Sequence, residues 1–224
     1  MSGDERATRS RVWRGCELVA SDIALADLDG YLADSSALTW LALFDPEPGV
    51  LDQLAEELQL DRHSVEDALA PRERAKVSRH ATHTFFTCYA ADLTVDDNDL
   101  PDLTIGRISA FVMPNGLITV RSARGAPIDL DEVVERWEGQ GLLGHGVGAL
   151  VHGLLDVLVD AHFGAVQLMD DKLEDLEDLL FAESVQTREV QRRVFALRKA
   201  LVRLRRVVLP MRELVAGVMR ERMT

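Results

Sequence analysis

An uninterrupted heptad stripe dominates the last third of the sequence. Apolar residues alternate steps of four and three at Val190, Val194, Leu197, Leu201, Leu204, Val208, Met211, Val215 and Val218. This spacing predicts a helix that buries one narrow seam. A similar stripe, with one slip at Val166, runs from residue 151 to residue 180. Because a short break at residues 183–187 separates the two stretches, we expect an antiparallel helical hairpin.

The two arms of the expected hairpin carry opposite charge. The acidic arm, 147–183, holds Asp156, Asp160, Asp170, Asp171, Glu174, Asp175, Glu177, Asp178 and Glu183 against the single base Lys172. The basic arm, 187–222, holds Arg188, Arg192, Arg193, Arg198, Lys199, Arg203, Arg205 and Arg206. A turn centred on Val185 would place Asp178 opposite Arg192 and Asp171 opposite Lys199.

That register leaves Arg203, Arg205 and Arg206 without acids across the hairpin. Either these bases find acids elsewhere, for example on a neighbouring subunit, or they form a solvated basic face.

Length and composition limit the functional classes to which the chain can belong. A chain of 224 residues with 47% hydrophobic residues can bury a proper core. The net charge of −13 disfavours nucleic acid as a partner and favours attraction of cations. Two cysteines, Cys16 and Cys88, are too few for a disulfide framework. Residues 1–10 do not resemble a signal peptide, and no window approaches the ~20 apolar residues of a membrane span.

The chain divides into a disordered leader (1–10), an α/β domain (11–145) and the helical hairpin (146–224). The expected fold class is α+β or α/β, with a mixed sheet and flanking short helices. Strands are expected at residues 12–20, 38–44, 82–93, 104–113 and 117–122, and short helices at 22–30, 50–58, 62–69 and 129–138. The apolar run Leu38–Phe44 is typical of a central strand buried on both faces.

Loop signals separate these elements. Ser21 or Asp22 is the expected N-cap of the first helix, and Asp61 is that of the helix at 62–69. Pro114-Asn115-Gly116 predicts a hairpin turn. Residues 72–80 are interpreted as a charged connection, 96–102 as an acidic loop and the glycine-rich 139–148 as a hinge.

Motifs for nucleotide binding or nucleophilic catalysis are missing, so no enzyme activity is expected. His152 and His162 are expected to be interior histidines. His80 and His83 introduce a strand, where residues three apart face opposite ways, which disfavours a shared metal. The carboxylates Glu66, Asp67, Asp156 and Asp160 have two interpretations. They form caps or salt bridges, or they bind Mg²⁺, which keeps most of its waters and needs only one or two carboxylates.

Four stretches together resemble one known family. They are HSVEDALAPRERAKV at 63–77, ISAFVMPNGLITVRS at 108–122, GALVHGLLDVLVDAHFGAVQLMDDKLEDLEDLLF at 148–181 and RRVFALRKALVRLRRVVLPMRELVAGVMR at 192–220. Their content, order and spacing are similar to those of the cytoplasmic domain of CorA-type magnesium and cobalt transporters. The chain departs from the common pattern at Ala75, where a proline usually stands.

The resemblance implies the cytoplasmic, soluble part of a homopentameric transporter of the cell (inner) membrane, which the chain would reach only through a missing stalk and pore. It also implies that magnesium is both the transported and the regulatory ion, with cobalt, nickel or zinc as possible alternatives. By motif match, Glu66, Asp67 and Asp156 would bind a regulatory divalent cation between subunits. Asp160, Asp170, Asp171, Glu174 and Asp175 would form an acidic surface that attracts cations.

Two alternative functions stay open from the sequence. The chain could be the domain of a related zinc transporter, or a soluble coiled-coil interaction protein without a transport role.

Overall fold

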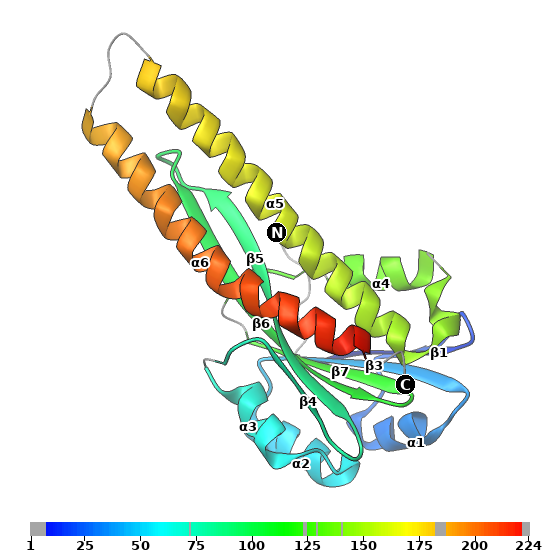
Figure 1. Ribbon diagram of the computed structural model, residues 1–224. Coiled ribbons are helices and arrows are strands. Elements are labelled where there is room, and N and C mark those ends of the chain that lie inside the picture. The colour runs from blue at the N-terminus through cyan, green and yellow to red at the C-terminus, as the bar shows by residue number, and fades with distance from the viewer. Residues whose placement is uncertain are drawn as a thin grey trace.

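The computed structural model describes residues 8–71, 73–122, 125–128, 130–139, 141–181 and 187–220. Figure 1 shows a twisted sheet with short helices on one face and longer helices on the other. The sheet has seven strands in the order β2-β1-β3-β7-β6-β5-β4. The strands are β1 (Thr8–Arg14), β2 (Glu17–Ser21), β3 (Ala37–Phe44), β4 (Lys76–Arg79), β5 (Thr84–Val95), β6 (Pro101–Met113) and β7 (Gly116–Arg121). Since β3 and β7 are parallel and the other neighbours antiparallel, the sheet is mixed, as expected.

The helices divide between the two faces of the sheet. One face carries the short helix η1 (Leu25–Asp27) with α1 (Leu28–Ala33), α2 (Pro48–Leu58) and α3 (Arg62–Leu69). The other face carries α4 (Leu130–Gly139), the short helix η2 (Leu142–His145), α5 (Val147–Phe181) and α6 (Thr187–Arg220). The expected central strand is confirmed: Trp40 of β3 packs on the α5 side and Leu41 on the α2 side. Helices cover both faces, which explains why this strand is almost entirely apolar.

The N-terminal region differs from the expectation. The strand expected at 12–20 is a hairpin of two strands, because Gly15 takes a positive φ of 62° and turns the chain. Thr8, Arg9 and Ser10, expected in a leader, form the start of β1; residues 1–7 lie outside the described part. Asp22 has a φ of 50° and caps no helix, and the first helical turn begins later, at Leu25.

The charged connection expected at 72–80 contains a strand. β4 pairs with β5 at the edge of the sheet, through Lys76 opposite Thr87 and Arg79 opposite Thr84. Charged residues suit an edge strand because they discourage pairing with further chains. This explains why composition alone pointed to a loop.

The helical hairpin is present, with arms that reach well beyond the helices of the other face (Figure 1). α5 and α6 both lie on the long β5–β6 ribbon, where Ala165 and Met169 of α5 and Leu204 of α6 pack against Leu93 and Leu103. Contrary to the expectation, α5 is long and apolar enough to span a membrane by length and composition, since an 18-residue window within it has a mean hydropathy of 1.4. However, 56% of that window is buried inside the protein.

Candidate functional site

The first pair of candidate acids, Glu66 and Asp67, lies in the last turn of α3. The Asp61 carboxylate accepts a hydrogen bond from the Ser64 amide at 2.9 Å, so the expected N-cap is confirmed. At the other end, the Arg107 guanidinium of β6 donates to the carbonyls of Ala68, at 2.7 Å, and of Ala70. Hydrogen bonds to side chains therefore stabilise both ends of α3.

Asp67 has a basic partner within the chain. The Lys76 ammonium donates to Asp67 Oδ2 at 2.6 Å and to Glu73 Oε2 at 3.1 Å. Burial lowers the pKa of Lys76, but its hydrogen bonds to these two carboxylates outweigh burial and raise the pKa overall. Glu66 is exposed and accepts from Arg62 Nε at 3.3 Å on its own helix.

Asp156 and Asp160, one turn apart on α5, share a single base. Arg136 of α4 donates to Asp156 Oδ2 at 2.5 Å and to Asp160 Oδ2 at 2.7 Å. It also donates to Glu132 at 2.8 Å. Hydrogen bonds to Asp160, Glu132 and Asp156 raise the pKa of Arg136, so the guanidinium stays charged at every physiological pH.

The structure does not bring the two candidate acid groups together. Glu66 and Asp67 lie on α3, on the face of the sheet with α2, whereas Asp156 lies on α5, on the opposite face. Among the described residues, no group of three or more His, Cys, Asp or Glu side chains could hold a metal ion.

The candidate acidic surface is exposed along the outer half of α5. Asp170, Asp171, Glu174 and Asp175 are all solvent-exposed, and Asp175 accepts from Lys172 at 2.7 Å. The expected pairs Asp178 with Arg192 and Asp171 with Lys199 are not formed: no ion pair within 4.0 Å joins an α5 acid to an α6 base in the described part of the hairpin. Instead, Asp99 of the β5–β6 turn accepts from Lys172 of α5 at 2.7 Å and from Arg193 of α6 at 2.8 Å. The ribbon thus bridges the arms.

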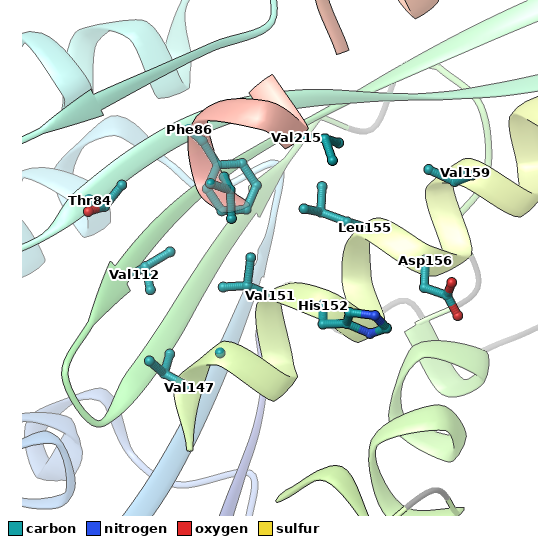
Figure 2. Close-up of a pocket in the computed structure, with 12 residues that line it drawn as sticks. Thr84, Phe86, Val112, Val147, Val151, His152, Leu155, Asp156, Val159 and Val215 are labelled. Atoms are coloured by element: carbon teal, nitrogen blue, oxygen red, sulfur yellow. The ribbon is translucent and has the colours of Figure 1, made fainter. Parts of the chain in front are cut away.

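An apolar pocket of about 330 Å³ lies between α5, the C-terminal part of α6 and the sheet. Figure 2 shows Val151 and Leu155 of α5 near Phe86 of β5 and Val215 of α6. His152 and Asp156 lie at its side, and His152 is exposed, contrary to the expectation. His162 is buried as expected, with Nε2 2.9 Å from the Tyr89 carbonyl oxygen.

The histidine pair also differs from the expectation. His80 and His83 flank the turn between β4 and β5, and their rings stack with centroids 4.8 Å apart. The turn brings the two residues to the same side, whereas a continuous strand would have separated them.

Sequence reasoning missed the bases that neutralise these acids. Lys76 lies in a stretch whose composition predicts a loop, and Arg136 lies in a predicted helix that nothing in the sequence links to Asp156. The i,i+4 spacing of Glu132 and Arg136 signals a pair on one helix. Nothing in the sequence signals that α4 brings Arg136 to α5.

Comparison with solved structures identifies the fold. The fold matches the soluble domain of CorA from Methanocaldococcus jannaschii with a TM-score of 0.66 and 18% identity, over 92% of this chain and 77% of that one. It also matches the ZntB cytoplasmic domain from Vibrio parahaemolyticus with a TM-score of 0.64 and 13% identity, over 85% of this chain and 78% of that one. The mixed sheet with its long helical hairpin is thus the fold of the CorA soluble domain and of the ZntB cytoplasmic domain.

The amino-acid sequence then identifies the family. The family described as CorA-like Mg²⁺ transporter protein matches residues 35–223, so this chain belongs to that family, which is a transporter family and not an enzyme family. The cobalt/magnesium transport protein CorA of Methanocaldococcus jannaschii is 22% identical over 91% of this chain. The chain spans 62% of the length of that relative, and 52% and 53% of two further relatives.

Proposed function

We propose that this chain is the cytoplasmic, cation-responsive part of a divalent metal-ion transporter, with magnesium as the transported and the regulatory ion. Membership of the CorA-like family over residues 35–223 carries the proposal. In the longer protein, the chain would lie on the cytoplasmic side of the cell membrane. It would assemble as a homo-oligomer, for which the resemblance implies five subunits.

The regulatory site would form between subunits. Glu66 and Asp67 of one subunit and Asp156 of another are the proposed ligands, and the acidic surface at Asp160, Asp170, Asp171, Glu174 and Asp175 would raise the local cation concentration. In the single chain, Lys76 pairs with Asp67, and Arg136 pairs with Asp156 and Asp160. Facing carboxylates of two subunits repel, by ~4 kcal/mol per close pair at an effective dielectric of 20, and a divalent cation reverses that repulsion. High magnesium would then hold the subunits together, and its loss would loosen the assembly and favour conduction.

Magnesium titration of the chain tests the proposal. Millimolar MgCl₂, compared with NaCl of equal ionic strength, is expected to raise the melting temperature and to increase self-association in sedimentation velocity. At ten times the dissociation constant, ligand binding adds about 1.4 kcal/mol of stability. Asp67→Asn and Asp156→Asn should each remove the effect. Asp52→Asn changes an exposed acid of α2 and should keep it.

If magnesium changes neither melting nor association, the cation-responsive function is wrong, and the chain is better described as an interaction domain without an ion role. Zinc is the second candidate ion, because the ZntB cytoplasmic domain has the same fold. A response to micromolar zinc with none to magnesium would select it.

A further inference from the structure

One ammonium group already occupies an acid of the proposed cation site. Lys76, the first residue of β4, donates to Asp67 Oδ2 at 2.6 Å and to Glu73 Oε2 at 3.1 Å. Among the described residues, no other cation lies within 4.0 Å of either carboxylate. The side chains of Lys76, Asp67 and Glu73 are only 24%, 26% and 25% exposed. Because partly buried charges are screened less than surface charges, this contact is stronger than an ordinary surface ion pair.

Side chains of the β5–β6 ribbon hold the backbone on both sides of this contact. The Arg107 guanidinium of β6 donates to three carbonyls at the C-terminal end of α3, among them that of Asp67 at 3.4 Å. The Tyr89 hydroxyl of β5 donates to the Glu73 carbonyl. Neither of these anchors involves the Lys76 side chain. The two carboxylates are therefore held near each other whether or not the ammonium lies between them.

The Lys76 side chain can leave this contact while its backbone stays in place. Lys76 is fixed in the sheet by the pairing of β4 with β5, where it lies opposite Thr87. Its ammonium is a compact, strongly hydrated charge at the end of a flexible stem. Two carboxylates are a donor set that suits Mg²⁺, because this ion keeps several of its waters and needs only one or two acids. An ammonium and a hydrated divalent cation thus compete for the same carboxylate oxygens.

We propose that Lys76 is a tethered competitor for the divalent cation at Asp67, and that it sets the cation concentration at which the site fills. This inference rests on the proposed function, in which Asp67 is a ligand. At low divalent concentration, the ammonium neutralises Asp67 and Glu73. Lys76 must move into solvent before Asp67 can take a divalent cation. A tethered group has an effective concentration on the order of millimolar, so the site fills only when divalent cations are abundant.

The charge of Lys76 determines the size of the effect. A unit charge ~6 Å from a divalent cation, in a dielectric close to that of water, opposes binding enough to change the dissociation constant about tenfold. Lys76→Gln is therefore expected to lower, about tenfold, the magnesium concentration that gives half of the maximal rise in melting temperature. Lys76→Arg keeps the charge at the same position of β4 and should leave that concentration close to the wild-type value.

Magnesium titration of the 224-residue chain at constant ionic strength, followed by thermal unfolding, measures this half-maximal concentration. Arg193→Gln is the matched control, because Arg193 also bridges two carboxylates, those of Asp99 at 2.8 Å and Glu189 at 2.9 Å, and its side chain is 25% exposed. This variant should lower the melting temperature without magnesium and leave the half-maximal concentration unchanged. If Lys76 had a purely structural role, Lys76→Gln would behave in the same way.

Chemical labelling of the wild-type chain gives a second readout that needs no substitution. The sequence contains three lysines, Lys76, Lys172 and Lys199. Because magnesium is expected to displace the Lys76 ammonium into solvent, acylation of Lys76 by an N-hydroxysuccinimide ester should rise as magnesium is added, as measured by mass spectrometry. Lys199 is exposed on α6 and serves as the internal reference.

Two results would overturn the inference: a half-maximal concentration in folded Lys76→Gln that is unchanged or higher, or a Lys76 reactivity that magnesium leaves constant. Circular dichroism shows whether Lys76→Gln is folded, and if it is not, the labelling of the wild-type chain decides. If the wild-type chain responds to magnesium and Asp67→Asn removes the response, the proposed function stands even when this inference fails. If neither the wild-type chain nor Lys76→Gln responds, both are wrong.

Discussion

The packing of α4 against α5 predicts opposite effects for two glycine substitutions on one helix. Gly153 and Gly164 both lie inside α5. A Cβ atom at Gly153 would lie 2.4 Å from Trp137 Nε1 and 2.5 Å from its Cδ1, whereas a Cβ atom at Gly164 would meet nothing within 4 Å. Gly153→Ala is therefore expected to destabilise the protein and Gly164→Ala to stabilise it.

The Trp137 indole has no room to retreat. It is fully buried, and its ring packs edge-on against Trp13, at 5.9 Å between centroids, and Trp40, at 5.0 Å. Its Nε1 donates to the Leu150 carbonyl at 3.1 Å, so displacement also strains a buried hydrogen bond. Overpacking of a core costs about 1–3 kcal/mol, and this rigid contact belongs at the upper end.

Replacing glycine by alanine in a helix interior contributes about 1 kcal/mol of stability. The net expectation is a loss of about 2 kcal/mol for Gly153→Ala and a gain of about 1 kcal/mol for Gly164→Ala. Urea unfolding followed by circular dichroism measures both, with the midpoint of Gly153→Ala lowered by roughly 1 M at an unchanged slope. If Gly153→Ala is as stable as Gly164→Ala, α4 does not pack on α5 through Trp137.

Two further predictions concern ionisable groups. Hydrogen bonds from Lys172 and then Arg193 lower the pKa of Asp99, so its contribution to stability is present above the unfolded pKa of about 3.9 and is lost as the pH falls through the folded value. Asp99→Asn should cost about 1 kcal/mol at neutral pH for two partly exposed pairs, while Asp97→Asn in the same turn should have no effect in the same urea assay. Burial lowers the pKa of His83 and of His162, and the nearby His80 lowers that of His83 further. Both side chains therefore stabilise the fold when they are neutral. The free energy of unfolding should fall as the pH drops below about 6.5, the unfolded pKa of histidine. The double variant His83→Gln, His162→Gln should flatten the decline between about pH 7 and pH 5, and an unchanged slope would show that other groups cause it.

The sequence predicted those parts of the fold that depend on local pattern. The apolar run of β3, the Asp61 cap and the two long helices all follow from periodicity or from side chains within a few residues of each other. Where a single residue redirects the chain, the prediction was wrong: Gly15 divides one expected strand into two. It was also wrong for β4, because an edge strand carries the charges of a loop.

The contacts of the candidate site that join distant segments of the chain could not be predicted from the sequence. The sequence identified Asp156 and Asp160 as unusual acids on an apolar helix, but the base that neutralises them comes from α4, 20 or more residues earlier. The attraction between the two arms was expected to be direct, yet Asp99 of the ribbon accepts hydrogen bonds from both arms and bridges them. Since each arm is bound to the ribbon through its buried seam, its remaining charges point outward.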